Sequence, residues 1–425
     1  MSSPMFATAI GVITLGIWLY LLLARGGFWL ARERDDRRQA PPPAVWPSVT
    51  AVVPARDEAD VIARSIGSLL AQDYPGAFKV ILVDDQSSDG TAEAALQAAR
   101  ERGAEARLEV IKGTPLPSGW TGKLWALSQG VARASAQDPP EFVWLTDADI
   151  GHAPGGLRSL VTRAEAGGLK LTALMVRLHC GTWPERLLIP AFVFFFQMLF
   201  PFGWVNDPKN KTAAGAGGCM LVRREALERA GGIAAVRAEI IDDCALAAKL
   251  KAQGPIWLGL ATRAESLRPY VTVGQIGRMV SRSAYAQLGY SPLVLAGTVL
   301  GMALTYLAPP LLAVFARGPA QAMGALAWLL MAITFQPMLA LYRRSRLWGF
   351  ALPAIGALYS LFTLQSALDV WRGKGGMWKG RAQARADRSR PPSGRTVVRS
   401  APIKNLSMES GPSGPVAIDG PGQNG

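Results

Sequence analysis

Two carboxylates stand one residue apart at the end of an apolar run. Residues 141–150 read EFVWLTDADI, and Asp147 and Asp149 close the run. Aspartate commonly ends strands and begins turns, so this pair alone proves little. Two carboxylates so close repel each other unless a cation lies between them. A hard divalent cation accepts such oxygen ligands together with phosphate oxygens and water. The pair therefore indicates a position where a cation meets a phosphate-bearing ligand.

Two further acidic pairs lie in comparable places. Asp84 and Asp85 follow another apolar run in VDDQSSDGT, and Asp242 and Asp243 precede an apolar helix in EIIDDCALAAKL. Taken alone, the second pair is explained by favourable charge at a helix N-terminus. Together, the three pairs supply what sugar transfer from a nucleotide diphosphate requires. These are ligands for a cation that neutralises the departing diphosphate, and a separate carboxylate that takes the acceptor's proton.

The elements that must position these acids alternate between strand and helix. The pattern predicts strands at 48–55, 78–85, 107–113 and 141–147, and helices at 57–72, 90–103 and 122–134. The helix at 57–72 opens with acids that suit its N-terminus. Near-continuous apolar strands between helices indicate an α/β fold, with a mixed, mostly parallel sheet covered by helices on both faces. In such sheets ligands bind at the carboxyl ends of the strands, which is where residues 57–58, 84–85 and 147–149 fall.

The composition points to a membrane protein and argues against nucleic acid as a partner. The chain has 425 residues, 50% of them hydrophobic, and a formal charge of +14. The basic residues cluster beside apolar segments. One cluster is RERDDRR after the first segment, and the other is residues 371–400, which contain nine Lys or Arg and a single acid, Asp387. This placement is typical of positive charge flanking membrane spans. Three cysteines and two histidines match no zinc pattern, so any metal would have oxygen ligands.

The apolar segments divide the chain into five parts. Residues 5–24 are predicted to be an uncleaved transmembrane anchor, 25–48 a basic, proline-rich linker, and 49–290 a cytoplasmic catalytic domain. Residues 291–370 hold three more apolar spans, and 371–425 form a basic tail that we expect to be disordered. The uncharged segment 187–204 is predicted to be interfacial or re-entrant, with a buried core helix as the alternative.

The positive-inside rule raises a conflict in this topology. With the catalytic domain in the cytoplasm, three late crossings place the basic tail outside. Either the last apolar segment is re-entrant or the tail is an exception.

The motifs, taken in order, resemble a known family. Over residues 49 to 285 the chain resembles a family 2 glycosyltransferase of the GT-A fold. The motifs that carry the resemblance follow the order of that family, and they are VVPARDE, VDDQSSDGT, GK..AL, TDAD, GAGGCMLVRREALERAGG, DD..LA and Q..R. SGWTGKLWALSQG, RMVSRSAYAQLGYSP and MWKGRAQA are similar to the hopene-associated glycosyltransferases of bacterial hopanoid gene clusters.

The resemblance implies a role for each motif. The residues that would bind the donor nucleotide are Pro54 with its turn, Glu58, Asp84, Asp85, Lys123 and Asp147. Asp149 would bridge Mg²⁺ or Mn²⁺ to the diphosphate, with Asp147 nearer the ribose as the other member of the metal motif. Gly217 and Gly218 would let the backbone approach the donor sugar.

The remaining motifs imply the catalytic base and the phosphate contacts. Asp243 would be the general base of an inverting transfer, with Asp242 as its acidic companion. The contacts to the diphosphate would come from Gln275, Arg278 and Arg282, although for Arg282 and Lys123 a solvated or membrane-surface role is an equal alternative.

Two departures from the family pattern limit the resemblance. QIGRM places Met279 where the family has a tryptophan, and RDE replaces Asn-Glu. In processive polysaccharide synthases that tryptophan helps to hold the growing chain, so its absence argues against processivity.

The resemblance therefore predicts a multi-pass enzyme of the bacterial inner membrane that transfers sugar from a nucleotide-sugar donor to a lipid acceptor, with a hopanoid suspected. The alternatives are a polyprenyl phosphate, a ceramide-like lipid or a diacylglycerol as acceptor. From another class, a non-catalytic membrane scaffold or transporter stays open.

Overall fold

The part of the chain between residues 49 and 266 is built on one eight-stranded mixed sheet. The computed structural model describes residues 3–37, 40–136, 138–373, 377–378 and 381–382, so the disorder expected of residues 383–425 lies outside the described residues. The strands are β1 (Val49–Ala55), β2 (Phe78–Asp84), β3 (Leu108–Lys112), β4 (Phe142–Thr146), β5 (Ile150–His152), β6 (Leu171–Arg177), β7 (Cys219–Arg223) and β8 (Ile256–Ser266). Their order across the sheet is β3-β2-β1-β4-β7-β6-β8-β5.

Most neighbouring strands are parallel, as the sequence predicts. β1 pairs in parallel with β2 and β4, β2 with β3, and β6 with β8. β7 is antiparallel to both β4 and β6, and β5 is antiparallel to β8. All seven residues of β1 are buried, because helices cover both faces of this central strand. The carboxyl ends of β1, β2, β4, β6 and β8 consequently meet at one edge of the sheet.

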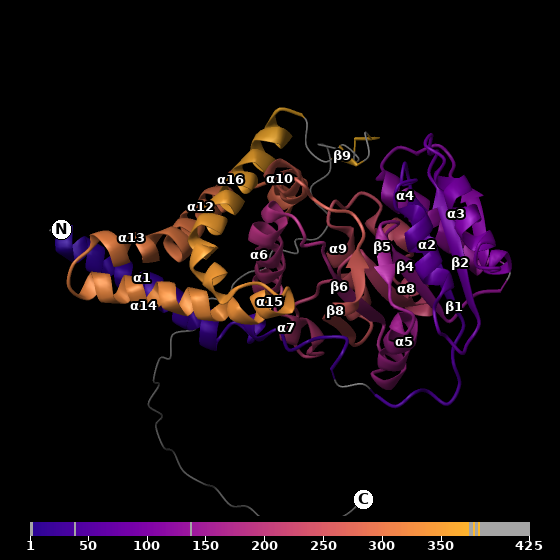
Figure 1. The fold of residues 1–425 in the computed structure, drawn as a ribbon, viewed down its shortest axis with the longest axis horizontal. Coiled ribbons are helices and arrows are strands. Elements are labelled where there is room, and N and C mark those ends of the chain that lie inside the picture. Colours follow the sequence, from indigo (N-terminus) through magenta and orange to yellow (C-terminus); the bar gives the residue numbers. More distant parts are fainter. Residues whose placement is uncertain (1–2, 38–39, 137, 374–376, 379–380, 383–425) are drawn as a thin grey trace, which may run out of the picture. The chain divides into compact units, whose positions relative to one another are not determined.

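Helices cover the two faces in separate groups (Figure 1). α2 (Ile62–Leu70), α3 (Thr91–Arg100) and α5 (Gly156–Ala166) contribute to one core, whereas α4 (Gly122–Ser135), α6 (Trp183–Leu199) and α9 (Asp242–Lys251) contribute to the other. Gly130 allows α4 to approach the sheet closely, since a Cβ there would lie 2.4 Å from Val52 Cγ1. The predicted start of the first helix is wrong: α2 begins at Ile62, because residues 57–61 form a turn that directs Glu58 inward.

Short helices accompany this part of the chain. They are α7 (Phe202–Asn206), α8 (Arg224–Arg229), α10 (Val273–Ser281) and α11 (Ala284–Gln287), with 3₁₀ turns η1 (Phe28–Leu30), η2 (Glu105–Arg107) and η3 (Ile233–Val236).

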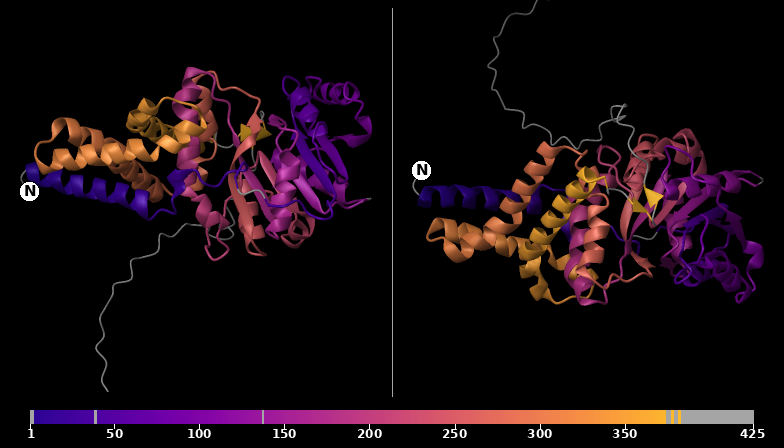
Figure 2. Two further views of the ribbon diagram at one scale, coloured as in Figure 1. Left: turned by 60° about the horizontal axis from the view of Figure 1, so that its bottom comes forward. Right: turned by 90° about the horizontal axis from the view of Figure 1, so that it is seen from above.

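The remaining helical segments are apolar. They are α1 (Ser3–Leu23), α12 (Pro292–Met302), the π-helical turn η4 (Ala303–Leu307), α13 (Ala308–Phe315), α14 (Pro319–Thr334), α15 (Gln336–Leu341), the 3₁₀ turn η5 (Arg346–Ala351) and α16 (Leu352–Trp371). Four segments are long and apolar enough to cross a membrane: Pro4–Leu23, Pro292–Phe315, Pro319–Leu341 and Arg346–Trp371. One is N-terminal and three are C-terminal, as predicted. Figure 2 shows them gathered on one side of the sheet.

α6 lies between the sheet and these apolar helices (Figure 1). The ring of Phe194 lies 5.1 Å from that of Phe335 in the turn after α14, and Phe195 lies 4.8 Å from Tyr359 in α16. Pro190 is inside the helix, yet most of the inward face stays buried. Phe194 and Phe195 thus pack against protein, as a core helix requires, and the interfacial position of residues 187–204 stays a prediction.

Candidate active site

Two turns at the rim of the sheet are bonded to each other. The Asp57 amide donates to Ser87 Oγ at 3.0 Å, and the Ser88 amide donates to Asp57 Oδ1 at 2.9 Å. Asp57 and Gln86 both have positive φ, at 50° and 57°. Such backbone is costly for residues other than glycine and persists only where the surroundings hold it. The sequence segments after β1 and β2 therefore form one rigid, polar cradle.

The acids predicted to bind the nucleotide lie in this cradle. The Asp85 side chain is fully buried, and Arg56 Nη1 donates to the Asp85 carbonyl at 2.6 Å and lies 4.0 Å from its carboxylate. Asp84 Oδ1 accepts from the Ser87 amide at 3.0 Å. The predicted turn at Pro54 is wrong, because this residue lies within β1 opposite Val83.

Arg268, which sequence reasoning missed, ties the cradle to the metal motif. Its guanidinium is ion-paired with Glu58, lies 3.0 Å from Asp60 Oδ1, and is 3.9 Å from Asp149 Oδ2. Residue 268 follows β8, whose carboxyl end lies at the same rim as those of β1 and β4. The only signal in the sequence is a basic residue just after a strand, and it becomes informative only when the strand order is known.

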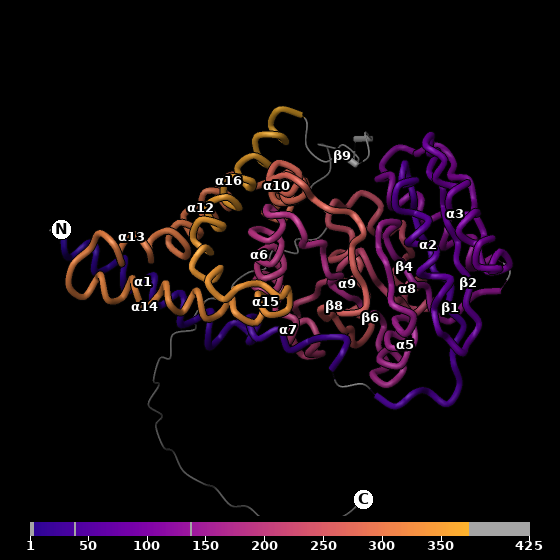
Figure 3. The backbone as a smooth tube through the Cα atoms, in the orientation of Figure 1, coloured from indigo at the N-terminus to yellow at the C-terminus, as the bar shows by residue number. Residues whose placement is uncertain are grey.

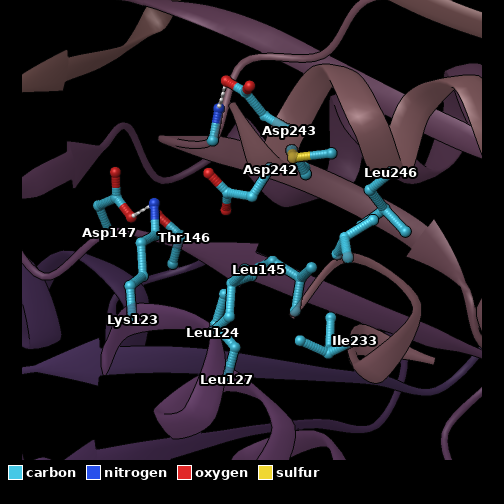
Figure 4. A pocket seen from close by; sticks show the side chains of 13 residues that line it. Lys123, Leu124, Leu127, Leu145, Thr146, Asp147, Ile233, Asp242, Asp243 and Leu246 are labelled. Atoms are coloured by element: carbon cyan, nitrogen blue, oxygen red, sulfur yellow. Dashed lines mark hydrogen bonds and ion pairs between the residues drawn. The ribbon is translucent and has the colours of Figure 1, made fainter. Parts of the chain in front are cut away.

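Asp147 and Asp149 differ in their surroundings. Asp147 Oδ1 is paired with Lys123 Nζ at 2.6 Å (Figure 4). Burial, and then the charges of Asp147 and Glu58, raise the pKa of Asp149 to about 6. The rim therefore holds more negative charge at Asp149 than its neighbours balance.

This donor set fits a divalent cation held jointly with a diphosphate. Among the described residues, no group of three or more His, Cys, Asp or Glu side chains is placed to hold a metal ion alone. Two carboxylates with additional phosphate and water oxygens are the usual ligands of Mg²⁺. The unfavourable charge at Asp149 is what such a cation would relieve, so the residues present fit the group.

Asp243 lies across the pocket from Asp147, at the start of α9. Its Oδ2 accepts from the Gly217 amide at 3.0 Å, and its Oδ1 accepts from the Cys244 amide at 2.7 Å. Burial, and then the neighbouring Asp242, raise the pKa of Asp243 to about 6. Asp242 points into the space between Asp243 and Lys123 (Figure 4). A carboxylate in such a setting is a competent proton acceptor near neutral pH.

The two glycines at this pocket have different roles. A Cβ on Gly217 would lie 3.2 Å from Lys123 Nζ and 3.7 Å from Asp243 Oδ2, so a side chain there would fill the space between the charged groups. A Cβ on Gly218 would instead meet Val176 at 3.2 Å. Gly217 thus keeps the pocket open, whereas Gly218 allows close packing. The pocket is lined by Lys123, Leu124, Leu127, Leu145, Thr146, Asp147, Gly217, Met220, Ile233, Val236, Asp242, Asp243 and Leu246.

The predicted diphosphate contacts sit on or beside α10. Gln275 Oε1 accepts from the amides of Val271 and Thr272 at 2.7 and 3.2 Å, so this side chain caps its own helix. Arg282 caps the carboxyl end of α10. Its charge lowers the pKa of Tyr270, whereas burial and then the charge of Asp149 raise this pKa. Arg278 lies one turn earlier on α10, beside Gly274. Arg282 and Asp149 thus both act on Tyr270, whereas Gln275 caps its own helix.

Glu185 is a second residue that sequence reasoning did not single out. It is fully buried and accepts from the amides of Gly181, Thr182 and Tyr270 at 2.9, 2.8 and 2.6 Å, and from His179 Nδ1 at 2.8 Å. These bonds lower the pKa of Glu185 against the opposing effect of burial. The Thr-x-x-Glu spacing of a capping box is the signal that could have found it.

Comparisons with known proteins bear on the domain and its fold. Residues 50–231 match the family model described as glycosyl transferase family 2. The solved structure of the mannosyltransferase PcManGT from Pyrobaculum calidifontis, in complex with GDP-Man and Mn²⁺, matches with a TM-score of 0.51 and 19% identity over 86% of this chain and 99% of that one. Mannosyl-3-phosphoglycerate synthase from Rubrobacter xylanophilus matches at a TM-score of 0.36 and 19% identity, over 59% of this chain and 78% of that one. No curated protein matches the chain significantly.

The fold and the family model define the class of the protein. It has the GT-A fold and carries a glycosyl transferase family 2 domain. The chain is therefore a glycosyltransferase.

Proposed function

We propose that the protein is a membrane-bound, metal-dependent, inverting glycosyltransferase that moves a sugar from a nucleotide diphosphate sugar to a lipid. The observation that carries this proposal is the pocket in which Asp243 and the Lys123–Asp147 pair face each other across Gly217. The four long apolar helices support a membrane location and a lipid acceptor. The positive charge after the first apolar segment favours a cytoplasmic catalytic domain in a bacterial inner membrane.

Each acid has a separate task in the proposed reaction. Glu58, Asp84 and Asp85 would hold the nucleoside in the cradle, and Asp147 and Asp149 would hold the cation. When bound, the divalent cation neutralises the charge that develops on the departing diphosphate. Lys123 and Arg282 contribute positive charge on the side of the phosphates.

Asp243 performs the proton transfer. Its carboxylate takes the proton of the acceptor hydroxyl as that oxygen forms a bond to the anomeric carbon. The bond from the anomeric carbon to the diphosphate breaks, and the electron pair leaves with the diphosphate. Because attack comes from the side opposite the leaving group, the anomeric configuration is inverted. Asp242 helps to keep the pKa of Asp243 high enough for this role.

The acceptor is proposed to be a hopanoid, with other lipids as alternatives. This finer assignment rests on the resemblance of SGWTGKLWALSQG and RMVSRSAYAQLGYSP to the hopene-associated enzymes. Polyprenyl phosphate, ceramide-like lipid and diacylglycerol stay as alternatives. Met279, where processive relatives have a tryptophan, favours transfer of a single sugar.

The test is nucleotide release by the purified full chain in detergent. A panel of UDP- and GDP-sugars is combined with Mg²⁺, Mn²⁺ or EDTA and with each candidate lipid, and mass spectrometry of the lipid reports how many sugars are added. We expect release that needs metal and one lipid, with one sugar transferred.

Asp243→Asn is the decisive variant for the base. We expect it to lower the turnover number by about 10²- to 10⁴-fold, the usual contribution of a general base. Donor binding measured by calorimetry should change by less than about threefold, since Asp243 does not contact the nucleotide in this scheme. Glu225→Gln, at an exposed position of α8, is the matched control and should leave both quantities unchanged. If Asp243→Asn turns over about as fast as the natural chain, Asp243 is not the general base.

A further inference from the structure

The apolar helices leave the catalytic domain and return to it. α1 packs against α13 and α14, and α13 packs against α14 after a turn at residues 316–318. α12 follows α11, which belongs to the catalytic side, whereas α15 contacts α6. The α12–α13 segment therefore leads away from the sheet, and the α14–α15 segment leads back (Figure 3).

α16 begins where α14 has returned. Gln336 Nε2 donates to the Arg346 carbonyl at 3.1 Å, and Trp328 Nε1 donates to the Phe350 carbonyl at 3.3 Å. A Cβ on Gly349 would lie 2.9 Å from the Ala332 carbonyl oxygen, so η5 is pressed against the last turns of α14. The start of α16 is thus fixed at the end of α14 nearest the catalytic domain.

α16 ends where α12 departs. The Tyr285 amide donates to Ser366 Oγ at 3.0 Å, and the Tyr285 ring lies 5.9 Å from that of Trp371. Tyr285, Leu295 and Ala367 form one buried cluster, and Leu295 belongs to the first turn of α12. Both ends of α16 are therefore beside the catalytic ends of other apolar helices.

The middle of α16 is docked on the catalytic domain. Tyr359 Oη donates to the Leu188 carbonyl of α6 at 2.9 Å. A Cβ on Gly277 of α10 would lie 2.8 Å from the Phe362 ring, and Ser366 Oγ is bonded to the Ser281 carbonyl. Residues 359, 362 and 366 lie on one face of the helix, spaced by about one turn each. Figures 1 and 2 show α16 running across the direction of α1 and α14.

The opposite face of α16 carries an exposed apolar stripe, in which the Trp371 ring also contacts Tyr285. Leu361, Leu364, Leu368 and Trp371 are 58%, 36%, 38% and 58% exposed. Their spacing of three and four residues places them on one side of the helix. A single apolar stripe ending in a tryptophan and Arg372 suits the boundary between acyl chains and headgroups.

We propose that α16 lies along the membrane surface and does not cross the bilayer. This rests on the membrane location proposed above. α1, α12–α13 and α14 are then the three membrane crossings. The apolar stripe of α16 is buried in the bilayer leaflet that faces the catalytic domain. A 26-residue apolar segment is long enough to span about 30 Å of hydrocarbon, but both ends of this one are held on the same side.

The proposal removes the topological conflict in the sequence. With three crossings, residue 372 lies on the side of the catalytic domain. The nine Lys or Arg residues between 371 and 400 then obey the positive-inside rule.

Sidedness is tested with single added cysteines in the full chain in sealed vesicles, read out with a membrane-impermeant maleimide. The positions are Glu101→Cys in the catalytic domain, Arg317→Cys between α13 and α14, and Arg372→Cys after α16, all of them exposed. The unmodified chain, with its three cysteines, gives the background. We expect residues 101 and 372 to be labelled from one side and residue 317 from the other. Labelling of residue 372 together with residue 317 would overturn the proposal and leave the transferase intact.

Depth is tested with nitroxide labels and the ratio of oxygen to nickel-complex accessibility. Ala354, Leu361 and Leu368 on α16 are compared with Met5, Val12 and Leu19 on α1, which have the same seven-residue spacing and are likewise exposed. Seven helical residues rise about 10 Å, so a crossing helix changes depth steeply between labels. We expect equal depths along α16 and a maximum at residue 12 along α1. A maximum at residue 361 would refute the in-plane helix, and a chain released from vesicles by alkaline carbonate would refute the membrane location as well.

Discussion

Asp147 already has a cationic partner in the ammonium group of Lys123. The 2.6 Å pair with Asp147 Oδ1, and the charges of Asp242 and Asp243 nearby, place Lys123 at the centre of the negative pocket. A divalent ion bound as proposed would therefore share Asp147 with this lysine. The sequence indicated both residues as part of the site, but the spacing of 24 positions gives no sign that they are partners.

Lys123→Met should bind metal more tightly when no donor is present. Removal of a unit charge a few ångströms away, at an effective dielectric constant of about 20, is worth more than 1.4 kcal/mol, so Mn²⁺ affinity should rise about tenfold or more. Calorimetric titration of the donor-free chain with Mn²⁺ measures this. Lys79→Met is the control, because Lys79 forms an exposed pair with Asp138 at 3.8 Å. If both variants and the natural chain bind Mn²⁺ with equal affinity, the charge of Lys123 does not influence the metal site.

With Asp243 as the base of the proposed reaction, its carboxylate should give the reaction a pH dependence. Burial and Asp242 raise its pKa to about 6, so below that pH the residue is protonated and cannot act as a base. We expect kcat/KM to fall tenfold per pH unit below about 6 and to level off above it. The same raised pKa means that the charged form costs folding stability above pH 6, a cost relieved as the pH falls. A profile that stays flat from pH 7 to pH 5 would contradict the assignment.

Among the elements, the strands that carry the acids were predictable and their neighbours across the sheet were not. Apolar runs followed by turn residues predict β1, β2, β3 and β4 from the sequence. The insertion of antiparallel β7 between β4 and β6 is a pairing of distant segments, which leaves no local period. Arg268 was missed for the same reason, since its partner Glu58 is 210 positions away.

Glu185 joins the start of α6 to the segment that leads into α10. Replacement by alanine leaves the amides of Gly181, Thr182 and Tyr270 without their shared acceptor in a buried place. We expect Glu185→Ala to lower the free energy of unfolding by about 2 to 4 kcal/mol. Chemical denaturation of the detergent-solubilised chain measures the loss. Glu225→Ala, which removes only an exposed pair with Arg229, should cost less than about 0.5 kcal/mol. A loss at Glu185 as small as that control would mean that water replaces the carboxylate.

At the scale of the molecule, composition predicted four apolar helices without predicting their courses. Hydropathy counts apolar residues along a segment, and α1 and α16 are alike by that measure. The difference lies in what each helix touches. Trp18 Nε1 of α1 donates to the Thr305 carbonyl of the π-turn η4, another apolar helix, whereas Tyr359 of α16 bonds to α6. Contacts of this kind depend on tertiary packing, which a hydropathy window does not contain.

One continuous core links the underside of the sheet to the apolar helices. Val52 of β1, Phe194 of α6 and Tyr306 of η4 belong to the same buried cluster. Residues 49–290 alone would therefore expose the outer faces of α6 and α10, now covered in part by α15 and α16. Exposed apolar patches larger than a few hundred Å² cause association in water.

We therefore expect residues 45–290 expressed alone to aggregate or to require detergent, in contrast to a catalytic domain that is merely tethered to its membrane helices. Size-exclusion chromatography with light scattering, without detergent, distinguishes the two. Residues 1–373 in detergent are the matched control and should give one monodisperse species and one cooperative unfolding transition, because the core is shared. A soluble, monomeric fragment 45–290 that unfolds cooperatively would show that α6 and α10 need no cover, and the docking of α16 would then add nothing to the stability of the sheet.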